Sequence, residues 1–281
     1  MASTKEIKRR IKSVTSTKQI ISAMELVSVV KMQKAVAKDL ASRNFTTLGT
    51  EVLSEVCSGI DLAMSPLLEK REGKRKLVIA ITSDRGLCGA LNARIIKQAI
   101  AETEDFETDF IAIGRKCRDF LTTHQFHVIA SYTSFGDDLE FSKIIPIIHQ
   151  VADDYLAGKY DIVRVVYTHF ESSLTQVPTA ATLLPFELDS ECEPADNIIF
   201  DPSKDEIITA LVPRILEAQA WQYILESAAS EHSARMVAMK NANENAEDLI
   251  FDLTLSFNQT RQAGITREIA EISAGKMTLE E

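Results

Sequence analysis

The chain has 281 residues, with 31 lysines and arginines against 41 aspartates and glutamates, so its formal net charge is −10. This length allows a sizeable core and more than one structural unit. The acidic balance weighs against a nucleic-acid-binding protein, which usually carries a basic surplus. The four cysteines lie far apart and form no CxxC or Cys/His pattern, so we expect a reducing compartment and no zinc site.

Membrane-spanning and targeting segments are not expected from the sequence. No apolar run approaches the roughly 18 residues of a membrane span, and no signal-peptide core follows the first methionine. The first 34 residues carry eight basic residues against two acidic ones. A mitochondrial transit peptide is a weak alternative for this basic start, because the pattern continues without a break as a long amphipathic helix.

The N-terminal segment, residues 1–58, is predicted to be one long helix, because it has no proline and one glycine, Gly49. Apolar residues keep helical spacing at Ile7, Ile11, Val14, Ile21, Met24, Val27, Met32 and Val36, and then at Phe45, Leu48, Val52 and Val56. This stripe is imperfect, since Lys18, Glu25 and Ser28 interrupt its strict heptad.

The middle of the chain, residues 75–200, is predicted to be a Rossmann-like α/β domain. We expect strands at Lys76–Ser83, Asp109–Gly114, His127–Tyr132, Asp161–Phe170 and Gln176–Phe186. We expect helices at Cys88–Glu102, Arg115–His124 and Leu139–Ala157. This alternation indicates a mostly parallel sheet with helices on its faces. Pro146 should kink the last of these helices. Eight carboxylates then follow between Glu187 and Glu206, in what we interpret as a solvated connector.

The C-terminal segment, residues 205–281, is predicted to be a long coiled-coil helix. Steps of four and three residues lead through Leu211, Ile215, Ala218, Gln222, Leu225, Ala229, His232, Met236, Met239, Asn243, Ala246, Ile250, Leu253 and Phe257. Eleven of these fourteen residues are apolar, which is typical of a coiled-coil seam. We expect the two terminal helices to pair antiparallel. Because the N-terminal helix is shorter, the end of the C-terminal helix should protrude without a partner.

The stretch SDRGLCGALN, Ser83 to Asn92, joins a predicted strand to a predicted helix, as phosphate-binding loops do. A P-loop requires GxxxxGK[ST] and a dinucleotide site requires GxGxxG, and the stretch matches neither pattern. We therefore interpret Asp84, Gly86 and Gly89 as parts of a structural turn. A nucleotide site, supported only by the affinity of helix N-termini for anions, is the less favoured alternative.

The sequence shows no other clear catalytic pattern. The five histidines are scattered, and we expect no autonomous active site, no metal site and no cofactor. The two ends of the chain are more informative. ISAMELVSVVKMQKA spreads apolar residues beyond one narrow stripe, and FNQTRQAGITREIAEISAGKMTL places Arg261 and Gln262 before a run of spaced isoleucines. We interpret this end as a helix that enters a sleeve in another protein; the alternative is a coiled coil with a solvated face.

These stretches resemble the gamma subunit of the F-type ATP synthase, the central rotor shaft, in its bacterial form. The matching stretches are IKRRIKSV, TKQI, AMELV, KMQKA, SDRGLCGALN, YTHFESSLTQVPTAATLLP and TRQAGITREIAEISAG. They cover nearly the whole chain in the family's order, and the last is the most specific. One departure is that Gly275 precedes Lys276, where the family usually has small residues. The cysteine-bearing regulatory insert of chloroplast members is not evident.

The resemblance implies a non-catalytic subunit of a rotary complex. The paired helices would turn inside a hexamer of alternating alpha and beta subunits, and the α/β domain would lie beside the epsilon subunit and the membrane ring of c subunits. Proton flow would turn the ring and the shaft, which would drive ATP synthesis and regulate ATPase activity and proton flow. The protein would be peripheral, on the cytoplasmic side of the bacterial cell (inner) membrane, and would touch the membrane only through the complex.

The resemblance also assigns residues. Arg261 and Gln262 match the pair that hydrogen-bonds to a loop of a beta subunit, and Met24 matches a position near an acidic lever of that subunit. The C-terminal motif of the family matches Ile265, Thr266, Glu268, Glu271 and Gly275.

Three alternatives remain open at this point. A Rossmann-like nucleotide or metabolite enzyme with a helical dimerisation arm would need a ligand near Asp84–Gly89. A static coiled-coil scaffold would use the same helices without rotation. The vacuolar-type central stalk is the nearest rival by mechanism, but its helical hairpin lacks an α/β insert of this size.

Overall fold

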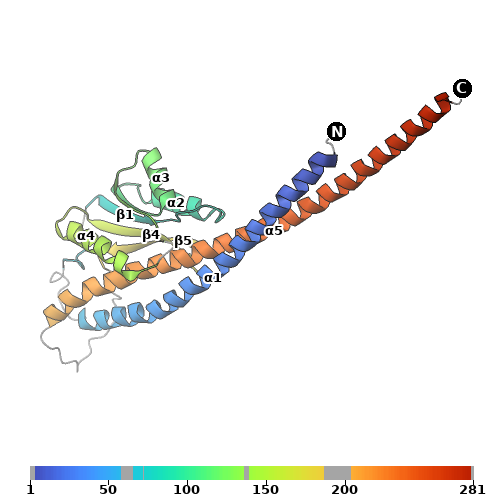
Figure 1. The fold of residues 1–281 in the computed structure, drawn as a ribbon. Coiled ribbons are helices and arrows are strands. Elements are labelled where there is room, and N and C mark those ends of the chain that lie inside the picture. The colour runs from blue at the N-terminus through green and yellow to red at the C-terminus, as the bar shows by residue number, and fades with distance from the viewer. Residues whose placement is uncertain (1–3, 58–65, 72, 136–138, 187–203, 280–281) are drawn as a thin grey trace. The chain divides into compact units, whose positions relative to one another are not determined.

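The chain forms two compact units. A computed structural model describes residues 4–57, 66–71, 73–135, 139–186 and 204–279. Residues 28–235 form the larger unit, and residues 1–27 with 236–281 form the smaller one. Two long helices, α1 (Thr4–Cys57) and α5 (Lys204–Leu279), contribute to both units (Figure 1). The division into three domains predicted from the sequence stays a prediction.

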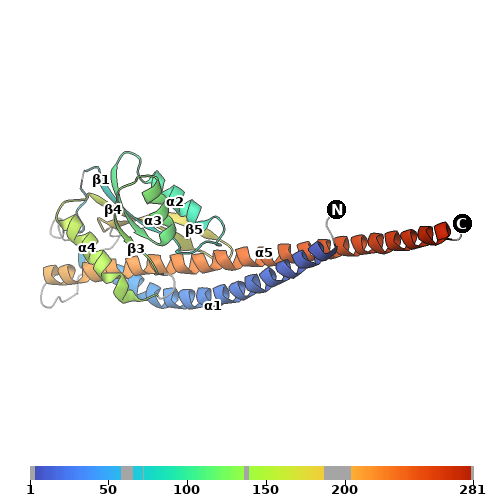
Figure 2. The same cartoon turned by 45° about the horizontal axis from the view of Figure 1, so that its top comes forward.

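The larger unit contains a sheet that lies beside α5 (Figure 2). Its five strands have the order β3-β2-β1-β4-β5. The strands are β1 (Arg75–Ile81), β2 (Glu107–Ile113), β3 (Val128–Tyr132), β4 (Ile162–Phe170) and β5 (Gln176–Leu184). The first four strands pair in parallel, and β5 pairs antiparallel to β4. In β1 every residue after Arg75 is buried, as expected for a central parallel strand. The predicted α/β class with a mostly parallel sheet is confirmed.

The two faces of the sheet are covered by different helices. Val78 and Ala80 of β1 pack against α2 (Leu91–Ala101) and α3 (Arg115–Thr123). Leu77 and Ile79 point the other way, because side chains alternate along a strand, and they share a core with α4 (Ile145–Leu156) and with parts of α1 and α5. Figure 1 shows the sheet between α2 and α3 on one side and α5 on the other.

The predicted kink at Pro146 is wrong. A short 3-10 turn, Phe141–Lys143, precedes α4 (Ile145–Leu156), and Pro146 lies in the first turn of α4. The first turn of a helix leaves its N–H groups unbonded, so proline fits there without distortion. Pro213, by contrast, lies inside α5, which begins at Lys204.

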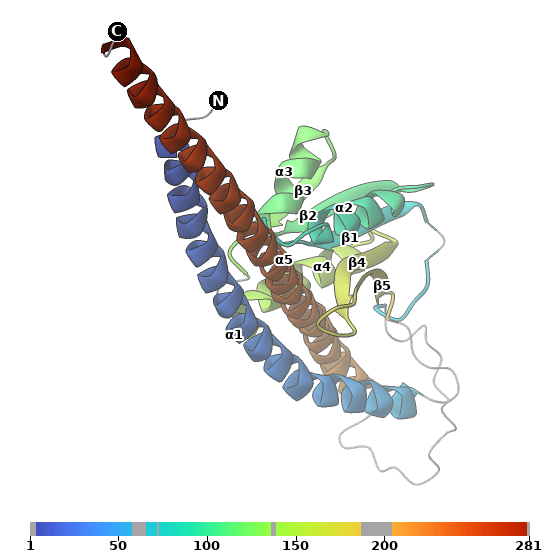
Figure 3. The same cartoon turned by 90° about the vertical axis from the view of Figure 1, so that its right-hand side faces the viewer.

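The two long helices pair antiparallel, as predicted (Figure 3). In the larger unit, Ala35 packs beside Ala228 and Ala229. Further along α1, Gly49 faces Ile215, which lies earlier in α5. In the smaller unit, the ammonium of Lys18 lies 3.2 Å from a carboxylate oxygen of Glu247.

Only part of the apolar stripe predicted for α1 is buried. Val27, Phe45, Leu48 and Val52 are all exposed, whereas Ser28, Asp39, Thr46 and Ser54 are buried. The buried positions are still separated by heptad steps, so the predicted helical period is confirmed. The prediction of which residues face inward is wrong at these positions. The contact face of α1 in the larger unit is therefore rich in polar side chains.

The protruding end of α5 is confirmed. All fourteen residues of its predicted seam, from Leu211 to Phe257, are buried or half-buried. From Arg261 to Ser273 every side chain is exposed. Across the described residues, no helix combines the length and hydropathy of a membrane span. The acidic stretch predicted as a connector lies mostly outside the described residues.

Candidate functional site

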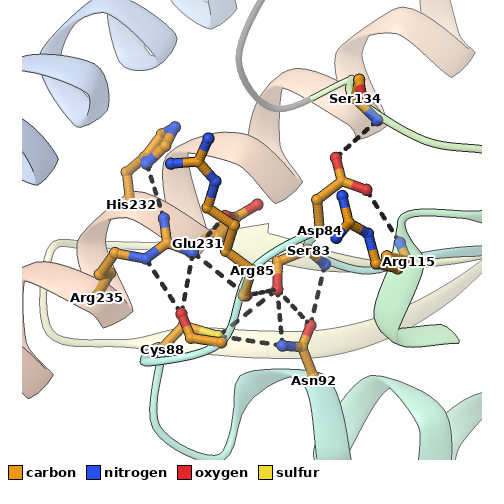
Figure 4. Close-up of polar contacts among 11 residues, drawn as sticks. Ser83, Asp84, Arg85, Cys88, Asn92, Arg115, Ser134, Glu231, His232 and Arg235 are labelled. Carbon is orange, nitrogen blue, oxygen red and sulfur yellow. Dashed lines mark hydrogen bonds and ion pairs between the residues drawn. The ribbon is translucent and has the colours of Figure 1, made fainter. Parts of the chain in front are cut away.

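The stretch Ser83–Asn92 lies against α5 in the larger unit (Figure 4). The guanidinium of Arg235 points from α5 toward this turn and donates to the carbonyl oxygen of Gly86 at 3.4 Å. The same guanidinium donates to Glu231 at 2.6 Å, and both side chains are almost fully buried. Burial raises the pKa of the Glu231 carboxyl, against the opposing effect of Arg235. The turn is thus joined to α5 by the guanidinium of Arg235, which is also paired with Glu231 of the same helix.

Asp84 holds two other segments in place. Its carboxylate accepts hydrogen bonds from the backbone N–H of Arg115 at 3.1 Å and from that of Ser134 at 2.8 Å. Arg115 is the first residue of α3, so Asp84 places a negative charge where the helix has unbonded N–H groups. This arrangement gives Asp84 a structural role, with both carboxylate oxygens already engaged.

A side-chain network closes the turn. Asn92 accepts a hydrogen bond from the backbone N–H of Ser83 at 3.0 Å, and its amide nitrogen donates to the Ser83 hydroxyl at 2.7 Å. The same nitrogen lies 3.2 Å from the sulfur of Cys88, which is buried. Cys117 is buried as well, and burial raises the pKa of its thiol to about 12.

The two glycines of the turn differ in their conformational need. Gly89 has a φ of 60°, in the left-handed region, and the neighbouring Leu87 has a φ of 65°. Gly86 does not lie in that region, and a Cβ added there would meet no atom within 4 Å. The left-handed conformation that favours glycine is therefore present at Gly89, whereas Gly86 contributes through its carbonyl group.

Alanine substitutions at these glycines should separate the two roles. Gly89→Ala is expected to lower the free energy of unfolding by about 1 kcal/mol, because a left-handed residue with a Cβ is strained. Gly86→Ala should change it by less than about 0.5 kcal/mol. Urea denaturation of the two variants checks this, and equal losses would contradict the distinction.

The crevice where Rossmann-like folds bind ligands is closed. In open α/β sheets the ligand site lies beyond the carboxyl ends of the strands, at the point where strand order reverses. Here that point lies between β1 and β4, and Ile81, Thr168 and α5 residues such as Ile224 and Glu231 surround a cavity of about 20 Å³. Such a cavity holds about one water molecule, whereas ligand pockets measure roughly 300–1,000 Å³. Among the described residues, this position therefore has no room for the ligand that the enzyme alternative requires.

The described residues also show no cluster of three or more histidine, cysteine, aspartate or glutamate side chains suited to a metal ion.

The second candidate site is the bare end of α5. Arg261 and Gln262 are exposed, and so are Thr266, Glu268 and Glu271. Thr266 donates its hydroxyl hydrogen to the carbonyl oxygen of Gln262 at 2.9 Å. Ile265, Ile269 and Ile272 form an apolar face with exposed fractions of 49%, 60% and 73%. Gly275 lies within the helix. An apolar face beside two planar donors, left uncovered by the described residues, is suited to contact with another protein.

Met24 does not lie with these residues. It is half-buried on α1, on the side that faces α5. Lys18 pairs with Glu247 in an antiparallel arrangement, so Met24 lies level with roughly residue 241 of α5, about 30 Å along the helix from Arg261. The two parts of the predicted contact are therefore separate along α5.

Comparison with known proteins identifies the family. The family model described as ATP synthase matches residues 3–279. The ATP synthase gamma chain of Desulforamulus reducens is 41% identical over the full length of both chains, and that of Roseiflexus castenholzii is 42% identical, also over the full length of both. This chain belongs to the ATP synthase gamma chain family.

Solved structures agree with the gamma chain fold. The rotor of the Euglena gracilis mitochondrial ATP synthase in rotational state 1 gives a TM-score of 0.68 with 17% identity, over 93% of this chain and 98% of that chain. The central stalk and c-ring structure of the Tetrahymena thermophila mitochondrial ATP synthase gives 0.61 with 24% identity, over 79% and 99%. At these identities the likeness shows the fold alone.

Sequence reasoning missed an ionic group between the helices of this gamma chain, in which two carboxylates are buried and their cationic partners are partly exposed. We call it the Asp39 cluster: Asp39 and Arg43 of α1, Glu226 of α5 and His169 of β4. Arg43 donates to Asp39 at 3.0 Å, and the ring Nδ1 of His169 lies 2.6 Å from Glu226. Burial raises the pKa of Asp39, partly offset by Arg43. The one local signal was the i, i+4 spacing of Asp39 and Arg43.

Proposed function

We propose that this gamma chain is the rotor shaft of a proton-translocating ATP synthase. It would transmit rotation of the membrane c-ring to the catalytic alpha/beta hexamer and regulate ATPase activity and proton flow, without catalysing a reaction itself. The solved neighbours support this proposal, since they are a rotor and a central stalk with its c-ring. The observation that carries it is the bare, amphipathic end of α5, which has no partner within the described chain.

The proposal gives the end of α5 two kinds of contact. Its exposed isoleucines would contact an apolar inner surface of the partner. They could move along that surface during rotation, because hydrophobic contact is non-directional. Arg261 and Gln262 would hydrogen-bond to a beta subunit at one rotation angle, and charge-assisted bonds of this kind are strong and geometrically selective. Contact would then be tight at one angle and lost at the next, so the three catalytic sites would experience different states in turn.

The remaining partners follow from the same proposal. The alpha and beta subunits would surround the paired helices, and the epsilon subunit and the c-ring would contact the larger unit. The protein would then be peripheral, attached through the complex to the cytoplasmic side of the bacterial cell (inner) membrane.

A reversible cross-link tests rotation directly. Asp252 is exposed, and it lies on the part of α5 that is still paired with α1. Two paired helices resist twisting more than one, so a cross-link there should hold the whole pair. A disulfide between Asp252→Cys and a cysteine placed on the facing beta subunit should abolish ATP turnover of the complex, and reduction should restore it. Turnover that continues with the disulfide formed would overturn the proposal and favour a static scaffold.

Two controls accompany this experiment. The complex with Asp252→Cys and no cysteine on the beta subunit should keep its activity under oxidation. The purified chain alone should show no ATP turnover, and appreciable turnover would point to the enzyme alternative instead.

A further inference from the structure

The outer surface of the larger unit has a groove between α2 and α3 that the proposed function does not use. We call it the α2/α3 groove; its volume is about 400 Å³. We call its half-exposed apolar residues, Ile96, Ile100 and Phe120, the floor, and its exposed lysines, Lys97 and Lys116, the edges; Asn92 and Ala93 complete the lining. The groove lies on the outside of the layer that covers one face of the sheet.

The two isoleucines of the floor do not belong to the core beneath it, whereas Phe120 also packs against that core. On α2, Ile95 and Ala99 are fully buried against the sheet, and they already supply the inward face of the helix. Ile96 and Ile100 lie one helical turn apart on a different side and are half-exposed. Phe120 of α3 is half-exposed as well and stacks on His124, with the rings 4.0 Å apart. These side chains form an apolar strip that nothing in the described chain covers.

The charge of the groove is opposite to that of the chain. The helices α2 and α3 carry five basic residues and one acidic residue, although the whole chain has a formal net charge of −10. The single acidic residue, Asp119, is already held by Arg118 at 2.7 Å. Among the described residues, the ammonium groups of Lys97 and Lys116 have no hydrogen bond or ion pair. The basic edges are therefore free to meet an acidic partner.

The shape of the groove indicates a helix as its occupant. A small molecule is usually enclosed over most of its surface, and this groove is too open for that, because its floor residues remain half-exposed. From Asn92 to Ile100 the groove follows α2 for about 12 Å, or roughly two turns of a helix laid along it. We propose that the α2/α3 groove binds an acidic amphipathic helix of a partner protein, with apolar residues on the floor and carboxylates beside the two lysines.

Binding of a designed peptide to the full chain tests this proposal. The probe is a fluorescent peptide of about four helical turns, with leucines along one face and glutamates on both sides of them. Fluorescence anisotropy should show binding, and Lys97→Glu with Lys116→Glu should weaken it about tenfold or more, because two favourable charge contacts become repulsive. Ile100→Ser should weaken it without any change of charge.

Matched controls separate the groove from general electrostatics. Lys74→Glu with Lys240→Glu changes the net charge equally, at two other exposed lysines, and should leave binding unchanged. A peptide with lysines in place of the glutamates should bind the Lys97→Glu, Lys116→Glu variant better than it binds the natural chain. Circular dichroism should show that all variants keep their helical content.

Several results would overturn the proposal. One is equal affinity for a scrambled peptide that lacks the apolar face, and another is binding that the Lys97 and Lys116 reversals leave intact. Displacement of the peptide by dodecanoate, or by vesicles of phosphatidylglycerol, would assign the groove to an anionic lipid instead. The experiment measures no ATP turnover, so its failure would leave the rotor proposal untouched.

Discussion

Replacing Arg261 and Gln262 together by alanine is expected to lower ATP turnover of the reconstituted complex by about tenfold or more while leaving assembly intact. Both side chains are exposed in the chain, so the substitutions remove little stability, within about 0.5 kcal/mol. A hydrogen bond to a charged group contributes about 1.5–3 kcal/mol, and about 1.4 kcal/mol corresponds to tenfold in rate. The loss should therefore appear only where the pair meets its partner.

The measurement is steady-state ATPase activity beside the amounts of alpha and beta subunits that co-purify. Arg267→Ala is the matched control, because it removes another exposed arginine from the same helix end and should leave the rate unchanged. Full activity of the double variant would exclude a coupling role for the pair. Loss of the alpha and beta subunits would assign the pair to assembly instead.

Arg235→Met is expected to destabilise the larger unit by about 3–5 kcal/mol, the usual cost of removing one partner from a buried ion pair. The substitution leaves the buried carboxylate of Glu231 without its cation and the carbonyl of Gly86 without its donor. Replacing both charges, as in Glu231→Gln with Arg235→Met, should recover most of the loss, because no buried charge is then unpaired.

Urea denaturation followed by the fluorescence of Trp221 reports on this unit, since Trp221 is the chain's one tryptophan and packs edge-on against Phe141. The control is Arg214→Met. Arg214 also pairs with a buried glutamate, Glu217, but its own side chain is 69% exposed, so the loss should stay below about 1 kcal/mol. Equal losses of unfolding free energy for Arg214→Met and Arg235→Met would mean that burial of the Arg235–Glu231 pair contributes nothing to stability.

The parts of the fold that could be predicted from sequence are those in which spacing reports burial. The seam of α5 and the strand alternation around β1 both have strong, uninterrupted periods, and both were located correctly. The inward face of α1 was not, because polar side chains such as Asp39 and Thr46 are buried there, whereas Phe45 and Leu48 are exposed. Periodicity gives the repeat of a helix but does not locate its covered face where that face is polar.

Proline was ambiguous for a related reason. A proline in an apolar helical pattern fits both a kink and a helix start, and only the chain before Pro146 decides between them. In the turn at Asp84–Gly89, the sequence indicated a structural role but not the partner. Arg235 lies 149 residues from Gly86, and no local pattern joins them. The contacts assigned to Met24, Arg261 and Gln262 stay predictions, because they concern other chains.

The Asp39 cluster has a mechanical consequence for the paired helices. An apolar seam alone specifies the register of two helices weakly, whereas a buried polar group fixes it. A slip of α1 by seven residues would separate Arg43 from Glu226 and leave that buried carboxylate without the guanidinium beside it. We therefore expect the cluster to oppose sliding, so that twisting or axial load applied to one helix passes to the other.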